Sequence, residues 1–159
     1  MGDRIIRLEE IIAAPAAEVW KAWSTVEGLR TFLAPDSVID VRVGGQWEIH
    51  FEPGSPVGSR GSEGCKVLEI KKGRLLAFEW NFEPGSPIRD EKTSVSIEIH
   101  AFGGAQCQVG LEQVGWKEGA DWDAGFERCS RTWNLALARL EHRFIDGPID
   151  WTNPWNPPA

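Results

Sequence analysis

The stretch WDAGFERCSRTWNLALARLEHRFID, residues 122–146, determines how the rest of the chain is interpreted. Apolar side chains recur in it at spacings of three and four, the period of one face of an α-helix. The members of this stripe are Trp122, Phe126, Cys129, Trp133, Leu137, Leu140 and Phe144. Gly147 and Pro148 follow directly, and this pair is typical of a helix end. The pattern predicts a long C-terminal helix that buries one face.

Upstream of this helix the hydrophobic period changes from about four to two, which is typical of half-buried strands. The expected strands cover residues 38–43, 47–51, 64–71, 76–82, 93–101 and 107–111. Gly44-Gly45, Lys72-Gly73 and Gly103-Gly104 separate neighbouring runs and suit tight turns. The pattern predicts an antiparallel meander with one buried face.

The N-terminal part adds one strand and two short helices. Arg4–Ile12 is a short apolar-rich run that predicts the first strand. Pro15 suits the first turn of a helix. Ser24-x-x-Glu27 is a capping-box pattern, so a second helix is expected to begin there and to run to about Leu33. The order of elements predicts an α+β domain over residues 1–147, followed by a Pro- and Trp-containing tail over 148–159.

Composition narrows the class of protein. The chain has 159 residues, a formal charge of −7 and no apolar run as long as a membrane span. A negative chain is repelled by nucleic-acid backbones and anionic membranes, so neither is an expected partner. Cys65, Cys107 and Cys129 are odd in number and widely spaced, which favours buried free thiols in a reducing compartment. We expect a cytoplasmic protein without metal or other cofactor.

Several motifs in this order resemble one known family. Pro15–Trp23 with the second short helix, VRVGGQWEI at 41–49, GCKVLEI at 64–70 and LLAFEW at 75–80 look like the Hsp90 ATPase activator homologue family of the START-like (SRPBCC) superfamily. The resemblance spans roughly residues 4–145. It implies a helix-grip fold, in which a curved antiparallel sheet of about seven strands wraps around the long C-terminal helix. It also implies an apolar cavity between sheet and helix.

The hexapeptide FEPGSP occurs twice, at residues 51–56 and 82–87. Pro and Gly make good turns anywhere, so the repeat has a purely local explanation. In a meander, however, these two turns lie at the same end of the sheet. The resemblance implies that such loops flank a cavity mouth, with Pro53, Gly54, Pro84 and Gly85 at its lips.

Aromatic residues on the inward phases either line a ligand cavity or fill it. The candidate ligand-binding residues are Trp47, Phe51, Phe78, Trp80, Phe82, Gln113, Phe126 and Trp133. Gln113 stands where many family members carry a histidine. A glutamine can hydrogen-bond a ligand but cannot shuttle protons, so this departure weakens any catalytic role.

Glu69 is the candidate pocket carboxylate. If Cys65 and Val67 point inward, the strand period turns Glu69 inward as well, and burial would raise its pKa. If Leu68 and Ile70 point inward instead, Glu69 is a surface residue. Both phases have apolar members, so the sequence leaves the choice open.

None of the three histidines is an expected metal ligand or catalytic base. His50 and His100 fall on the polar phases of separate strands and should face solvent. His142 lies near the end of the long helix, where a cation suits the helix dipole. No common nucleophile, phosphate-loop or metalloprotease motif accompanies them.

Three functions are consistent with these observations. The first is binding of a small hydrophobic or amphipathic ligand between the sheet and the C-terminal helix. The second is a co-chaperone-like contact with a protein partner, part of a stress response, which the resemblance implies. The third is a cyclase- or hydrolase-like enzyme, which the absence of tyrosine and of an inward histidine disfavours. Trp151 and Trp155 in the tail pack on the domain, on a neighbour or on nothing, so either a monomer or a homodimer is expected.

Overall fold

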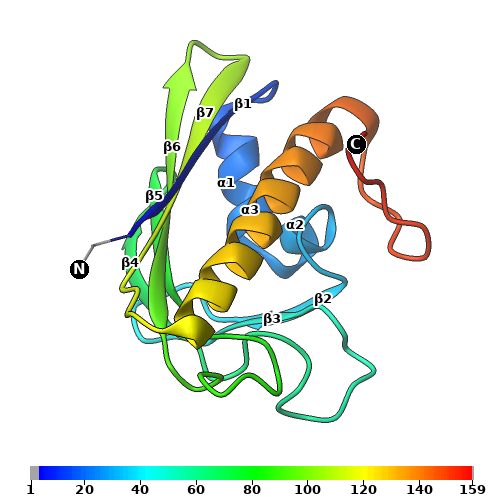
Figure 1. Ribbon diagram of the computed structural model, residues 1–159. Helices are drawn as coiled ribbons and strands as arrows, with labels where there is room; N and C mark the ends of the chain where they lie inside the picture. The colour runs from blue at the N-terminus through cyan, green and yellow to red at the C-terminus, as the bar shows by residue number, and fades with distance from the viewer. Residues whose placement is uncertain (1–3, 159) are drawn as a thin grey trace.

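The computed structural model describes residues 4–158 and shows a long helix lying along one face of a curved sheet (Figure 1). The elements are β1 (Ile6–Ile12), α1 (Ala16–Ser24), α2 (Val26–Arg30), β2 (Asp36–Ile39), β3 (Trp47–His50), β4 (Val67–Lys71), β5 (Leu75–Trp80), β6 (Thr93–Phe102), β7 (Gln106–Val114) and α3 (Ala120–Asp146). This is the predicted α+β helix-grip fold. α3 ends at Gly147, which has a φ of 99° that suits glycine.

The strands form two sheets rather than one continuous meander. Five antiparallel strands lie in the order β1-β7-β6-β5-β4, and β2 pairs only with β3. Two isolated bridges, Gln46 to Lys66 and His50 to Gly61, connect β3 with the segment before β4. The predicted pairing between these strands was therefore wrong in extent, because the chain leaves β3 for a long loop and makes only two bridges on its return.

Local hydrogen bonds move two predicted boundaries. Thr25, not Ser24, caps α2, since the Thr25 hydroxyl accepts from the Gly28 N–H at 2.9 Å. The Ser24 hydroxyl instead donates to the carbonyl of Trp20 at 2.7 Å. β2 ends at Ile39, before the predicted Val43, because residues 40–45 hydrogen-bond among themselves in a wider turn.

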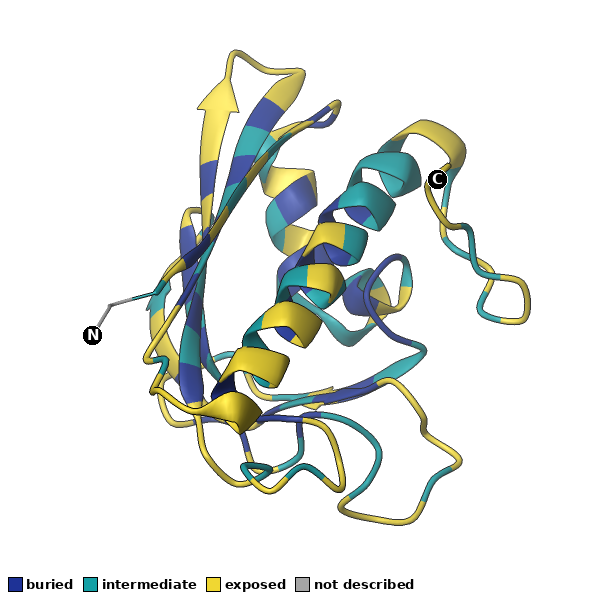
Figure 2. Ribbon diagram, viewed as in Figure 1, coloured by how far each residue is buried: buried dark blue, intermediate teal, exposed yellow. Residues whose placement is uncertain are grey.

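Aromatic side chains fill much of the space between the sheet and α3. Figure 2 shows buried segments on the strands and on the side of α3 that faces them. Trp47 stacks on Phe78 with ring centroids 4.4 Å apart, and Trp80 meets Trp133 at 4.7 Å. Trp47, Phe78 and Trp133 are completely buried. Burial of each such side chain contributes roughly 1.5–3 kcal/mol, so this cluster is a main source of stability.

A bulge in β4 decides the orientation of Glu69. Val67 pairs with Phe78, while Glu69 pairs with Ala77, so Leu68 is an extra residue on this strand. The bulge shifts the inward phase from Val67 to Ile70, which pairs with buried Leu76, and both Leu68 and Glu69 are exposed. Glu69 lies on the outer face and is not a pocket carboxylate.

The tail returns to the domain after α3 and runs beside it (Figure 1). The Ile149 N–H donates to the carbonyl of Thr31 at 2.9 Å, just beyond α2. Further along, Trp155 stacks on His142 with ring centroids 4.0 Å apart. Of the alternatives left open for the two tail tryptophans, packing against the domain is the one observed.

Candidate ligand-binding cleft

A cleft of about 1020 Å³ opens between the two FEPGSP loops, α3 and the tail. The first loop and its continuation supply Phe51, Glu52, Ser55, Ser59, Arg60, Gly61 and Ser62, and the second supplies residues 82–87. α3 forms the opposite wall from Asp121 to Arg139, a length of about 27 Å at 1.5 Å per residue. Both copies of the repeat thus border the same opening.

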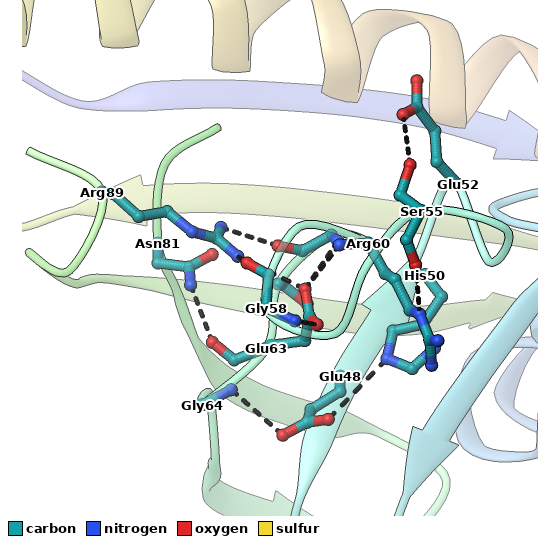
Figure 3. Close-up of polar contacts among 12 residues, drawn as sticks. Glu48, His50, Glu52, Ser55, Gly58, Arg60, Glu63, Gly64, Asn81 and Arg89 are labelled. Carbon is teal, nitrogen blue, oxygen red and sulfur yellow. Dashed lines mark hydrogen bonds and ion pairs between the residues drawn. The ribbon is translucent and has the colours of Figure 1, made fainter. Parts of the chain in front are cut away.

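Glu63 shapes the first loop from within (Figure 3). Its carboxylate accepts backbone N–H groups from Gly58, from Arg60 at 2.7 Å and from Gly61 at 3.0 Å. Burial alone would raise the pKa of the Glu63 carboxyl, but these N–H donors and the nearby His50 hold it below the usual value. A charged carboxylate therefore fixes the turn at residues 58–61.

Arg89 joins the two loops (Figure 3). Its guanidinium donates to the carbonyls of Gly61 at 2.7 Å and Gly58 at 2.8 Å in the first loop, and to that of Phe82 at 2.5 Å in the second. It also lies 3.3 Å from the Glu63 carboxylate, and both side chains are mostly buried. Because Arg89 bonds both loops at once, it couples their positions.

The second loop also contacts the N-terminal half of α3. Arg128 pairs with Glu83 at 2.9 Å. A Cβ added at Gly125 would meet the Phe82 ring at 2.6 Å, so a glycine is what allows the loop to approach the helix here. The second loop and the N-terminal half of α3 thus line the same end of the cleft.

The cleft has an apolar floor and a polar rim. Phe51 meets Trp80 edge to face at 6.0 Å, and Phe82 lies beside them among the lining residues. Charged side chains of both signs stand around this floor; they are Glu52, Arg60, Glu83, Asp121, Arg128 and Arg139. Such a surface can bury the apolar part of a small molecule while its polar groups meet the rim.

The structure separates the candidate ligand residues into two groups. Phe51, Trp80 and Phe82 line the cleft, as do Pro84 and Gly85 of the second loop. The residues that do not line it are Trp47, Phe78, Gln113, Phe126, Trp133, Pro53 and Gly54. A prediction that a residue faces inward was therefore not enough to identify it as a residue of the cleft. The aromatic rings fill most of the space that they face.

Gln113 belongs to the core hydrogen-bond network. Its side-chain oxygen accepts from Trp133 Nε1 at 2.8 Å, and its side-chain nitrogen donates to Thr93 Oγ1 at 2.8 Å. The residue is completely buried. Gln113 thus links β7 to α3 and β6, and these bonds engage the amide that was predicted to meet a ligand.

Phe126 lies outside the cleft near the N-terminal strand. Its ring packs edge to face on Trp116 at 5.0 Å, and the Arg4 guanidinium lies 5.0 Å from its centroid. The helical stripe is therefore wider than the cleft, and Phe126 covers the neighbouring edge of the sheet.

His50 is buried, so the prediction that it faces solvent was wrong. The alternation of β3 was read correctly, since His50 lies opposite Ile49. The loop that Glu63 shapes covers this face, and Gly61 forms a bridge to His50. His50 Nε2 lies 3.7 Å from the Glu48 carboxylate. Neither Glu63 nor Arg89 stood out in the sequence, because several charged residues follow each FEPGSP copy and nothing in the pattern distinguishes these two.

The described residues contain no cluster of three or more His, Cys, Asp or Glu side chains suited to a metal ion. Within residues 4–158, none of the helices is long and apolar enough to cross a membrane. All three cysteines are free and buried.

The fold and the cleft define a helix-grip protein of the START-like type. The model of the family described as "Activator of Hsp90 ATPase homolog 1-like protein" matches residues 13–144, and the chain belongs to this family. A comparison with curated protein sequences gave no match.

Solved structures of low sequence identity share the fold. The protein MLL2253 from Mesorhizobium loti is 19% identical, with a TM-score of 0.70 over 90% of this chain and 97% of its own. The Aha1 dimer from Colwellia psychrerythraea is 21% identical, with a TM-score of 0.68 over 91% and 98%. CalU16 from Micromonospora echinospora is 23% identical, with a TM-score of 0.67 over 93% and 78%.

Proposed function

We propose that this protein binds a small amphipathic molecule in the cleft between the FEPGSP loops and α3. The observation that carries the proposal is the aromatic floor of Phe51, Trp80 and Phe82 beneath a charged rim, in a cleft of about 1020 Å³. This volume lies at the upper end of the range of small-molecule sites. The position differs from the predicted one, because the ligand lies beside the aromatic core rather than within it.

The rim favours a ligand that carries polar groups as well as an apolar body. Arg128 and Glu83 neutralise each other at 2.9 Å, so this part of the rim offers hydrogen bonds without a strong net charge. Asn81 is 6% exposed and lines the cleft, and its side-chain nitrogen donates to the carbonyl of Glu63 at 2.9 Å. A purely aliphatic molecule would remove water from the rim without replacing its hydrogen bonds, which costs binding free energy.

The test is to fill the cleft from α3. Thr132 lines the cleft, whereas Asn134 is exposed on the same helix and lies outside it. In the Thr132→Trp variant the indole should occupy the space and weaken binding of the probe anilinonaphthalene sulfonate about tenfold or more, equivalent to ~1.4 kcal/mol. Asn134→Trp should bind the probe like the wild type. Equal binding by both variants would refute a site in this cleft.

Family membership favours a second candidate, contact with an Hsp90-type ATPase. The relative from Colwellia psychrerythraea is an Aha1 dimer, and a homodimer is the corresponding assembly for this chain. Stimulation of an Hsp90-type ATPase by the purified protein, with its mass in solution measured alongside, tests both points. No stimulation would remove this candidate and leave the ligand proposal intact.

A further inference from the structure

The tail is fixed to α2 by two hydrogen bonds. Besides the bond from Ile149 to Thr31, the Trp151 indole N–H donates to the carbonyl of Arg30 at 2.7 Å. Both acceptors lie at the C-terminal end of α2, where carbonyl groups lack partners within the helix. The tail thus satisfies groups that the short helix leaves open.

Arg139 on α3 holds the same segment from the other side. Its Nε donates to the carbonyl of Trp155 at 3.0 Å, and its Nη2 donates to Asn156 Oδ1 at 2.9 Å. Its guanidinium lies 5.5 Å from the Trp151 ring centroid. The stacking of Trp155 on His142, with planes 6° apart, adds a further contact. Together these contacts hold the tail between α2 and α3.

Trp151 is at once a tail residue and a lining residue of the cleft. At this end the lining is mainly apolar, and its other members are Phe32, Leu33, Pro35, Leu135 and Ala136, with Arg139 beside them. The charged rim residues Glu83, Asp121 and Arg128 lie near the opposite end of the α3 wall. The cleft therefore has a polar end at the second FEPGSP loop and an apolar end at the tail.

We propose that the tail is part of the ligand site, with Trp151 as the wall that limits how long an apolar group the cleft accepts. This inference rests on the proposed function, and it adds the residue that determines which ligand lengths the cleft accepts. The family match ends at residue 144, so this wall is built by residues beyond the matched stretch. Ligand length is thus set outside the part of the chain that defines the family.

The experiment uses the straight-chain alcohols from octanol to tetradecanol, which displace anilinonaphthalene sulfonate from the full-length protein. In the wild type, affinity should rise about fourfold per added methylene and then stop rising where the chain meets Trp151. In Trp151→Ala the rise should continue to longer alcohols. Trp151→Phe keeps an aromatic wall and should retain the wild-type limit.

Ile145→Ala serves as the control, because Ile145 is 64% exposed at the end of α3 and lies outside the cleft. It should leave the chain-length series unchanged. A wild-type series without a limit, or the same limit in Trp151→Ala, would overturn the role of the tail while leaving ligand binding in place. If no alcohol displaces the probe, and Thr132→Trp binds the probe like the wild type, the proposed function itself fails.

Discussion

Glu10 on β1 and Glu141 on α3 hydrogen-bond through their side chains, although both are carboxyl groups. Burial, the hydrogen bond to Glu141 and the charge of Glu141 together raise the pKa of Glu10 from 4.5 to about 7, with burial as the largest cause. Since the folded protein holds this proton more tightly than the unfolded chain does, stability falls as pH rises from about 4.5 through about 7.

The Glu10→Gln variant removes this titration. We expect it to unfold at a higher urea concentration than the wild type above pH 7, and to lose that advantage as the pH approaches 4.5. The measurement is the urea midpoint across this pH range. Glu9→Gln, on the exposed face of the same strand, is the matched control and should keep the wild-type slope. A parallel pH profile in Glu10→Gln would show that the pair does not share a proton.

Single residues were predictable only where the strand period continued undisturbed. Gln113 was correctly placed on the inner phase of β7, but its partners Trp133 and Thr93 come from distant elements that alternation does not reveal. Glu69 was undecidable, because a bulge at Leu68 changes the phase without a glycine or proline to mark it. The exposure of side chains in β4 therefore depends on pairing with β5 and not on the pattern of β4 alone.

At the scale of elements, the two FEPGSP loops behave as one structural unit. Arg89 donates to Gly58 and Gly61 in the first loop and to Phe82 in the second, and it pairs with Glu63. Removing it leaves these carbonyls without their side-chain donor and Glu63 without its cation, in a mostly buried position.

The Arg89→Ala variant should lower the free energy of unfolding by about 2–4 kcal/mol. It should also speed hydrogen exchange at the N–H groups of Gly58, Arg60 and Gly61, because Glu63 loses its cation. Arg42→Ala is the control, since Arg42 is 72% exposed and pairs only locally with Asp40; its cost should stay below about 1 kcal/mol. A change in stability without faster exchange in the loop would contradict the coupling of the two loops.

Element order was predicted well, because each strand and helix carries its own period and its own turn residues. The separation of β2 and β3 from the larger sheet was not predictable. It depends on how the loop after Phe51 returns, and Glu63, which shapes that return, does so mainly by accepting backbone N–H groups. A carboxylate in a polar loop has no distinctive sequence pattern.

For the whole molecule, the three buried thiols provide a test of how tightly the domain is closed. Burial raises the pKa of Cys65 to about 12 and that of Cys129 to about 11, and it also raises the pKa of Cys107. The thiolate is the reactive form, so these thiols should react slowly for two reasons: they are buried and they stay protonated.

We expect the native protein to react very slowly with a thiol reagent and all three cysteines to react at once when it is unfolded in urea. The measurement is the number of thiols modified over time at increasing urea. Cys65 lies just before β4, Cys107 on β7 and Cys129 on α3, and cooperative unfolding of the domain should make all three reactive together. One thiol that reacts much earlier would reveal local opening of its element.

The fold was predictable from period and order, whereas the cleft was only partly so. Phe51, Trp80 and Phe82 line the cleft, whereas Trp47, Phe78 and Trp133, which the same strand and helix periods predicted, fill the core. Whether a ring lines a space or fills it depends on the packing of all its neighbours. The position of Trp151 at the cleft was likewise not predictable from the sequence, since it depends on contacts of the tail with α2 and α3.

The closeness of Trp80 and Trp133 gives the core an optical property of its own. Their ring centroids are 4.7 Å apart and their planes are tilted by 56°. Two indoles held so close and so tilted couple their electronic transitions, which divides an absorption band into two components of opposite rotational strength. The folded protein should thus show an exciton couplet in circular dichroism. This signal would report on the packing of β5 against α3 without any added label.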